Sequence, residues 1–247
     1  MPLRPAPAPP RRLRNQVALV TGASRGIGLA IARALAAEHC NLILTGRDQS
    51  ALNKVSRELA SAKIKILAHS CDLRDPHSVD HLFRAIRGEF KHLDILINNA
   101  GIAHANLTVD NLPLPLWQDV IDTNLTGTFL VTQAALPIMK RGSTIVNNLS
   151  IAASRVFTGS AAYIASKHGA LGLTNTLREE LRPKGIRVIA LMPGATDTAI
   201  WNTFWPQAPR KKMMSSATIA AVVVNAILLP PNATVETLEI LPTAGIL

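Results

Sequence analysis

The sequence predicts an α/β protein, a single doubly wound domain with a seven-stranded parallel sheet and helices on both faces. Short apolar runs alternate with longer segments whose apolar residues recur at helical spacing. Hydrophobic residues make up 48% of the 247 residues and aromatic residues only 4%, so Ala, Val, Ile and Leu must build the core. That composition suits helices packed on a parallel sheet better than an all-β sandwich.

Seven apolar runs are interpreted as buried strands. The first two end at Thr21-Gly22 and Thr45-Gly46, where glycine permits a sharp turn out of the sheet. In chain order the expected strands are residues 17–20, 42–44, 64–68, 94–97, 144–147, 186–191 and 238–241.

Helices are expected between these runs. Asp75-Pro76 opens the third, since proline is tolerated in a first helical turn, and Pro113 and Pro115 break the chain before the fourth. The expected helices are residues 27–38, 50–62, 76–86, 116–139, 160–181 and 217–229.

The first fourteen residues differ from the rest of the chain. They are rich in proline and contain four arginines and no acid, so we expect a disordered tail over residues 1–14 and one domain over residues 15–247. The tail supplies four of the ten units of net positive charge. The remaining basic residues are scattered along the chain, which argues against a nucleic-acid partner.

Composition also bears on metals, membranes and location. Cys40 and Cys71 lack ligand-spaced partners, so we expect no metal site and no disulfide, in a reducing, cytoplasmic compartment. The longest apolar run, residues 219–229, contains Asn225 and is too short to span a membrane.

A glycine-rich turn lies between the first expected strand and helix. Thr21-Gly22-Ala23-Ser24-Arg25-Gly26-Ile27-Gly28 has GxxxGxG spacing. The pattern is compatible with a simple tight turn, but between a strand and a helix it also fits a site where backbone N–H groups bind a pyrophosphate.

The end of the second strand bears on which dinucleotide is bound. The chain reads Thr45-Gly46-Arg47, where an NAD site usually has an acid for the ribose hydroxyl. Arg47 and Arg25 suit a 2′-phosphate, although Asp48 is close enough in sequence to reach a ribose. We therefore expect NADP(H) rather than NAD(H).

Tyr163 and Lys167 are four residues apart in the expected helix 160–181, so they share one face. A cation beside a phenol favours the phenolate and should lower its pKa towards the range useful for general acid/base catalysis. Taken alone, such a pair is more often a half-buried aromatic residue and a solvated charge, because the pattern is short and common.

Together these motifs resemble the short-chain dehydrogenase/reductase family from about Val17 to the C-terminus. The family's TGxxxGxG, NNAG, Ser, YxxxK and PG motifs occur in order, and the resemblance implies a Rossmann fold and a carbonyl reductase type that prefers NADP. The catalytic residues implied are Asn124, Ser150, Tyr163 and Lys167. The cofactor-binding residues implied are Gly22, Ser24, Arg25, Gly26, Ile27, Gly28, Arg47, Asp72, Leu73, Asn98, Ala100, Gly101, Tyr163, Lys167, Pro193, Gly194, Thr196 and Thr198.

The resemblance also implies a role for each catalytic residue. Tyr163 exchanges a proton with the oxygen of a carbonyl or alcohol, and Ser150 hydrogen-bonds the same oxygen. Lys167 lowers the pKa of Tyr163 and holds the nicotinamide ribose, and Asn124 anchors a water. The implied activity is hydride transfer between NADP(H) and a ketone, aldehyde or secondary alcohol.

Two segments depart from the family pattern. Asn148-Leu149 stands before Ser150 where relatives often have a small residue or a second Ser. The substrate loop, about residues 196–215, is short and carries Trp201, Phe204 and Trp205, which we interpret as a lid over an apolar substrate. The triplet Arg210, Lys211 and Lys212 is interpreted as solvated charge.

Several alternatives remain open at this stage. An acidic carrier protein on the basic triplet would make the chain a 3-oxoacyl-acyl-carrier-protein reductase. A non-catalytic NADPH-binding regulator and a nucleic-acid binder come from other classes. A sugar epimerase also uses YxxxK, but this chain lacks the large C-terminal region of those relatives. By resemblance we expect a homotetramer, or else a homodimer, packed through the small residues of helix 160–181.

Overall fold

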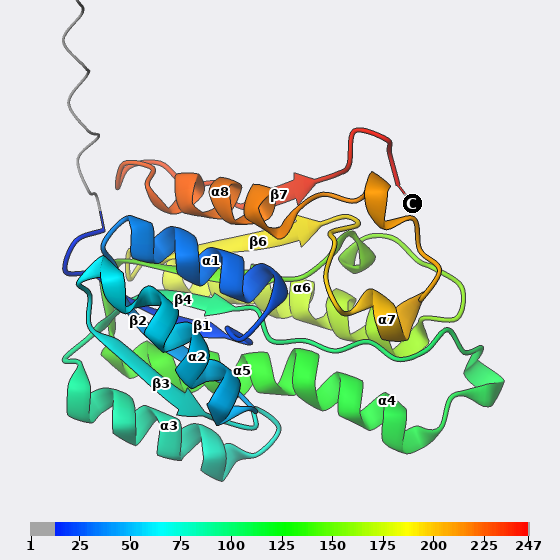
Figure 1. The fold of residues 1–247 in the computed structure, drawn as a ribbon, viewed down its shortest axis with the longest axis horizontal. Helices are drawn as coiled ribbons and strands as arrows, with labels where there is room; N and C mark the ends of the chain where they lie inside the picture. Colours follow the sequence, from blue (N-terminus) through cyan, green and yellow to red (C-terminus); the bar gives the residue numbers. More distant parts are fainter. Residues whose placement is uncertain (1–12, 247) are drawn as a thin grey trace, which may run out of the picture.

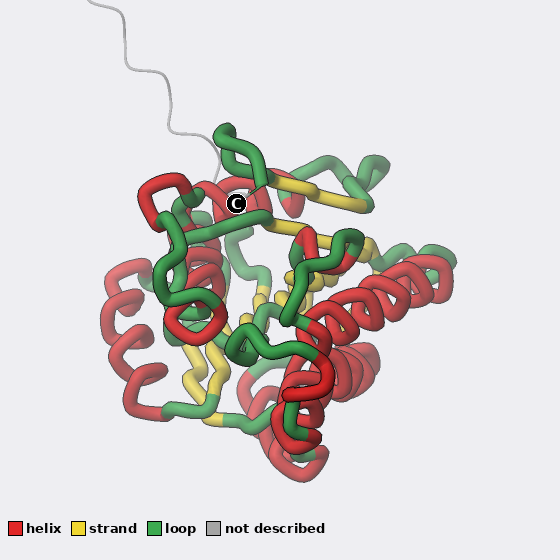
Figure 2. Tube along the Cα trace, turned by 90° about the vertical axis from the view of Figure 1, so that its right-hand side faces the viewer, coloured by secondary structure: helices red, strands yellow, loops and turns green. Residues whose placement is uncertain are grey.

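A computed structural model describes residues 13–246, which form one parallel sheet between two helical layers (Figures 1 and 2). The sheet order is β3-β2-β1-β4-β5-β6-β7, and every pairing is parallel. The strands are β1 (Val17–Thr21), β2 (Asn41–Gly46), β3 (Ile66–Ser70), β4 (Leu93–Asn98), β5 (Met139–Asn148), β6 (Arg187–Pro193) and β7 (Thr237–Ile240). The predicted fold class is confirmed.

The helices cover both faces of the sheet. Their bounds are α1 (Gly26–Ala37), α2 (Gln49–Leu59), α3 (Pro76–Glu89), α4 (Leu114–Ile121), α5 (Gly127–Ala135), α6 (Ala161–Leu181), α7 (Trp201–Phe204) and α8 (Ser216–Ile227). One core cluster joins α1, α2 and α8 to one face, and a second joins α3, α5 and α6 to the other. None of the helices in the described part of the chain has the length and hydropathy needed to cross a membrane.

Side-chain caps explain where several helices begin. Asp48 accepts the N–H of Ala51 at the start of α2, and Asp75 accepts the N–H groups of His77 and Ser78 before α3. Each carboxylate satisfies backbone donors that have no partner inside the helix. The expected Asp75-Pro76 helix start is therefore borne out, and Asp48 has a structural role that the sequence reading did not give it.

The expected long helix over residues 116–139 is wrong as a single element. The chain forms α4, one π-helical turn (Asp122–Thr126) and α5, then a 3₁₀ turn (Leu136–Ile138). Strand β5 already begins at Met139, earlier than expected. The π turn contains Asn124, and such turns often mark functional sites.

The expected tail boundary also needs correction. Residues 1–12 lie outside the described residues, but Leu13 is buried and belongs to the core cluster on the α1, α2 and α8 face. Its carbonyl oxygen accepts the N–H of Gln16 just before β1. The folded part of the chain thus starts no later than Leu13.

The order of the strands positions the site. Strands β1 and β4 are neighbours, and the chain leaves them towards opposite edges of the sheet. In open parallel sheets a crevice forms outside the carboxyl ends of the strands at this switch point, and ligands bind there.

Candidate active site

A cavity of about 740 Å³ lies at the carboxyl ends of the strands. Its walls come from the β1–α1 turn, the segments after β2 to β6, the start of α6 and the loop that carries α7. Most of the residues expected from the sequence meet here. Those that line the cavity are Gly22, Ser24, Arg25, Gly26, Ile27, Arg47, Asp72, Leu73, Ala100, Gly101, Ser150, Tyr163, Lys167, Pro193, Gly194, Thr196 and Thr198.

The glycine-rich turn forms one wall by close backbone packing. Gly22 and Gly26 have φ angles of 62° and 57°, which side chains rarely adopt. A Cβ on Gly22 would lie 3.0 Å from the Cα of Ala100, and a Cβ on Gly26 would lie 3.3 Å from the Thr198 methyl group. Because Gly22 and Gly26 have no side chain, the turn packs closely against its neighbours and its backbone lines the cavity.

Gly28 does not line the cavity, contrary to expectation. It is buried in the first turn of α1, where a Cβ would overlap the Asn99 amide and the Gly22 carbonyl oxygen. Gly28 thus permits the close packing that shapes the turn, and its expected part in cofactor binding stays a prediction.

Asn98 is also not among the lining residues, and its neighbour Asn99 is. The Asn98 amide donates to Thr132 Oγ1 and Asn147 Oδ1, both at 2.9 Å, inside the core beneath α5 and α6. Successive residues of a strand face opposite sides, so Asn99 points the other way and donates to the carbonyl oxygens of Thr21 and Gly22. The alternation of side-chain directions along a strand could have predicted from the sequence that Asn98 and Asn99 have different surroundings.

Positive charge gathers at the β2 end of the cavity. Arg25 and Arg47 line it there, and Asp72 supplies a carboxylate beside them. Asp48 is not a lining residue, because its carboxylate caps α2. Asp48, the acid that kept NAD(H) binding possible in the sequence analysis, thus has its carboxylate at the start of α2 and not in the cavity.

Three of the expected catalytic residues, Ser150, Tyr163 and Lys167, line the same cavity. Tyr163 and Lys167 share one face of α6, and the Lys167 Nζ lies 5.6 Å from the centroid of the Tyr163 ring. The Lys167 ammonium donates to the Asn148 carbonyl oxygen at 3.0 Å. Ser150 Oγ accepts the N–H of Ala152 at 3.1 Å and is also hydrogen-bonded with the Tyr163 phenol.

Burial shifts both titrating groups towards their neutral forms. It raises the pKa of the Tyr163 phenol, against an opposing hydrogen bond with Ser150, and it lowers the pKa of Lys167 to about 8. The net direction is upward because desolvation outweighs the hydrogen bond with Ser150, and the expected lowering of the Tyr163 pKa by Lys167 stays a prediction.

Asn124 lies behind the cavity wall, within the π turn. Its side chain accepts the N–H of Ile102 and donates to the Ile102 carbonyl oxygen and to Ser166 Oγ, at 2.8–3.0 Å. These bonds fix the segment after β4 against the start of α6. The expected water at Asn124 stays a prediction.

An aromatic cluster covers Tyr163. The Phe204 ring lies 5.8 Å from the Tyr163 ring, and Trp201 packs against Phe204 and Trp205 at 5.7 and 6.3 Å. Leu149, Ile151, Phe157 and Ile200 add further apolar lining. The charged lining residues among those described are Arg25, Arg47, Asp72 and Lys167, and uncharged polar residues that include Asn106, Thr158, Ser160 and Thr203 line the cavity as well.

Arg210 holds the loop that carries this cluster, so the interpretation of the triplet as solvated charge is wrong for Arg210. Its guanidinium donates to Asp197 Oδ1, to the Thr198 carbonyl oxygen at 2.6 Å and to Asn202 Oδ1 at 2.7 Å. The Trp201 indole adds a bond to the Thr196 carbonyl oxygen. The sequence showed the charge but not these partners, which lie eight to thirteen residues away.

The residues of the cavity fit a phosphorylated dinucleotide. Narrow glycine backbone suits a pyrophosphate, Arg25 and Arg47 suit a further phosphate group, and Ile27 and Leu73 provide apolar surface. No group of three or more His, Cys, Asp or Glu side chains among the described residues is placed to hold a metal ion.

Comparison with known proteins identifies the class. Residues 16–209 match the family model for short chain dehydrogenases. That match covers most of the chain, so the protein belongs to the short-chain dehydrogenase/reductase family, and it is an oxidoreductase of that family.

Particular relatives narrow the comparison. The chain is 38% identical over 188 residues to a putative ketoacyl reductase of Streptomyces coelicolor, which covers 74% of this chain and 72% of the relative. The solved structure of an alcohol dehydrogenase from Thermococcus sibiricus, complexed with 5-hydroxy-NADP, is 30% identical in sequence with a TM-score of 0.86. The match covers 92% of this chain and 97% of that chain. A short chain dehydrogenase of Burkholderia cenocepacia in complex with NADP is 30% identical with a TM-score of 0.85 and covers 95% and 98%.

Proposed function

We propose that the protein is an NADP(H)-dependent oxidoreductase that transfers a hydride between the nicotinamide and an apolar carbonyl compound or secondary alcohol. One observation carries the proposal. Ser150, Tyr163 and Lys167 meet in the same cavity as the narrow glycine-rich turn and the Arg25–Arg47 end, so reacting and phosphate-binding groups face one ligand space.

The bound nicotinamide supplies or accepts the hydride, and the chain supplies the proton chemistry. Tyr163 gives its proton to the substrate oxygen in reduction and takes one in oxidation. Ser150 donates a hydrogen bond to the same oxygen and stabilises the charge that develops there. Lys167 stabilises the phenolate of Tyr163 when protonated and holds the nicotinamide ribose.

Preference for the phosphorylated cofactor is supported by charge. Arg25 and Arg47 line the adenosine end, and the Asp48 carboxylate is engaged by α2. The Thermococcus and Burkholderia structures carry NADP or its derivative. The same arrangement supports cofactor roles for Asp72, Leu73, Pro193, Gly194, Thr196 and Thr198.

The substrate is proposed to be apolar, because Phe204 and its aromatic neighbours cover Tyr163. Reduction of a carrier-bound 3-oxoacyl group is the second candidate. It is favoured by the Streptomyces relative and by Lys211 and Lys212, which are exposed within the substrate loop. The test compares kcat/KM for a free apolar ketone with kcat/KM for a carrier-bound 3-oxoacyl group. Equal values would exclude this second candidate.

Tyr163→Phe tests the activity. We expect loss of NADPH-dependent turnover across a panel of ketones and aldehydes, with NADPH binding retained, because the ring keeps its packing and loses only the hydroxyl group that exchanges the proton. Turnover that survives in the variant contradicts the role of Tyr163. A wild-type chain that binds NADPH and turns over no carbonyl or alcohol supports the non-catalytic regulator instead.

We propose a homotetramer, or a homodimer, in the cytoplasm. The small residues of α6 support this assembly less than expected, because Ala162 and Ala170 are buried in their own chain and Gly169 packs on Leu125. Cys40 and Cys71 are free, as suits a reducing compartment. Light scattering that finds a monomer would exclude the assembly.

A further inference from the structure

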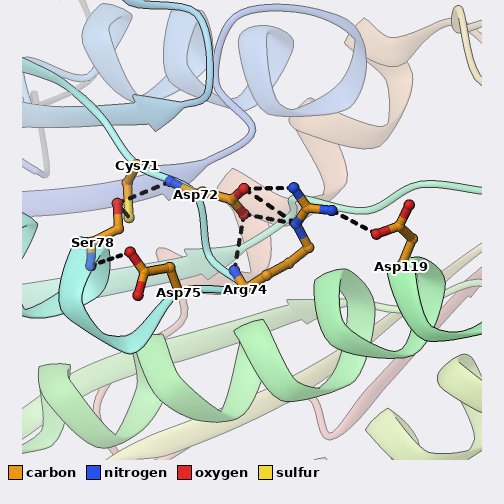
Figure 3. Close-up of polar contacts among 6 residues, drawn as sticks. All are labelled: Cys71, Asp72, Arg74, Asp75, Ser78 and Asp119. Atoms are coloured by element: carbon orange, nitrogen blue, oxygen red, sulfur yellow. Dashed lines mark hydrogen bonds and ion pairs between the residues drawn. The ribbon is translucent and has the colours of Figure 1, made fainter. Parts of the chain in front are cut away.

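Arg74 grips Asp72 at the adenosine end of the cavity (Figure 3). The Arg74 Nε donates to both carboxylate oxygens of Asp72, at 3.0 and 3.2 Å, and Nη2 donates to Oδ2 at 2.7 Å. The backbone N–H of Arg74 adds a bond to Oδ1 at 3.0 Å. Both oxygens of the carboxylate are thus occupied by one residue.

Asp72 is the only acid among the described residues that line the cavity. It lies near Arg47, whose charge is among those that lower the pKa of the Asp72 carboxyl, after the larger contribution of Arg74. A free carboxylate here would attract the Arg47 guanidinium and repel a phosphate. When Asp72 is paired with Arg74, its carboxylate attracts the Arg47 guanidinium less strongly and repels a phosphate less strongly.

We propose that Arg74 is a positioning residue that sets selectivity for the 2′-phosphate, by holding and neutralising Asp72 so that Arg47 stays available. This inference rests on the proposed NADP(H) preference. Arg74 itself is not a lining residue of the cavity, so it acts through Asp72.

A second contact of Arg74 offers a structural explanation that must be separated from this one. Its Nη1 donates to Asp119 Oδ1 on α4 at 2.6 Å, so Arg74 also ties the β3–α3 loop to α4. Asp119→Asn weakens that tie and leaves the Asp72 pair intact. It is the matched control.

The experiment measures calorimetric binding of adenosine 2′,5′-bisphosphate and of adenosine 5′-phosphate, which differ by the 2′-phosphate. Arg74→Gln should weaken the bisphosphate by about threefold to tenfold, a modest effect because the pair is partly exposed, and change the monophosphate by less than about twofold. Asp72→Asn in the Arg74→Gln background should restore the wild-type ratio, and Arg74→Lys should be intermediate. Asp119→Asn should keep the wild-type ratio.

Two results overturn the role of Arg74: an unchanged ratio in Arg74→Gln, or the same loss in Asp119→Asn. Circular dichroism melts check that each variant is folded. If Arg74→Gln does not fold, the binding ratio of the Arg74→Lys variant serves as the test instead. A wild-type chain that binds both adenosine ligands equally contradicts the NADP(H) preference itself. Wild-type selectivity that survives in Arg74→Gln contradicts only the inference on Arg74.

Discussion

At the scale of single residues, the reacting pair is governed by loss of water. Tyr163 and Lys167 are both moved towards neutrality, so the centre carries less charge than two isolated side chains would at the same pH. Because water is excluded from this part of the cavity, a charge that develops on a substrate oxygen interacts more strongly with hydrogen-bond donors near it than it would in water.

Lys167 should make stability depend on pH. Its pKa is about 8 in the folded chain against 10.5 as the ordinary value, so between these values the unfolded chain holds a proton that the folded chain has released. The free energy of unfolding then rises with pH across this window. Relative to Lys167→Met, the wild type should gain about 1–2 kcal/mol between pH 7 and 9.5.

Urea unfolding of both proteins at the two pH values measures this gain. Both keep Tyr163, and the range stays below the pH at which the phenol ionises. Parallel stabilities of wild type and Lys167→Met across the window would show that Lys167 is protonated in the fold throughout.

Sequence spacing brings the expected catalytic pair together but does not predict its environment. Spacing alone brings Tyr163 and Lys167 together on a helix, whereas their pKa directions depend on segments distant in the chain that exclude water. A motif also treats neighbouring residues alike. Asn98 and Asn99 face opposite sides of the sheet, and only Asn99 lines the cavity.

At the scale of elements, the turn into α1 depends on the absence of a side chain at Gly28. Gly28→Ala should lower the free energy of unfolding by about 1–3 kcal/mol, because the new methyl group overlaps Asn99 and the Gly22 carbonyl oxygen. It should also weaken NADPH binding, since the turn must shift to make room.

Gly172→Ala is the control for this change. Gly172 lies within α6 with nothing within 4 Å of the added methyl group, so helix propensity should stabilise the chain by up to about 1 kcal/mol. Thermal melts and NADPH fluorescence titrations compare the two. Equal behaviour of both variants would mean that the turn tolerates a side chain at Gly28.

The loop over Tyr163 should open when Arg210 is removed. Arg210→Ala loses three charge-assisted bonds to Asp197, Thr198 and Asn202, so KM for an apolar ketone should rise by about threefold to tenfold with a smaller change in kcat. Lys211→Ala, which removes the same charge from an exposed neighbour, should leave both constants unchanged. Steady-state kinetics with an equal rise in KM for both variants would assign the effect to net charge.

The interrupted helix shows where periodicity stops being informative. Apolar spacing across residues 116–139 predicted one helix, since a π turn shifts the register by a single residue and leaves the pattern nearly intact. Strand β5 begins early because Met139 pairs with Leu93, a contact between segments far apart in the chain. Local sequence does not record such a pairing.

At the scale of the whole molecule, strand number and sheet direction followed from the alternation of strands and helices. The domain boundary did not, because Leu13 looks like part of a proline- and arginine-rich segment. A single apolar residue beside many polar ones gives no periodicity to detect.

Leu13 should contribute to global stability. Leu13→Ala removes a buried side chain from the α1, α2 and α8 face, and we expect a loss of about 2–3 kcal/mol in the free energy of unfolding. Arg14→Ala, at an exposed position next to it, should have little effect. Denaturant melts with no difference between the two would return the domain boundary to residue 15.

The amide pair of Asn98 and Asn147 has a consequence for how this chain can diverge. Asn98 bonds Thr132 of α5 and Asn147 of β5, and Asn147 bonds Thr174 of α6 at 2.9 Å, so four buried residues share one set of donors and acceptors. Replacing one of them leaves a buried polar group unpaired, at a cost of about 1–3 kcal/mol. A change at one of these positions is therefore expected to be tolerated best when its partner changes with it, and the buried bonds of Asn98 give this residue a role in folding whether or not it contacts a ligand.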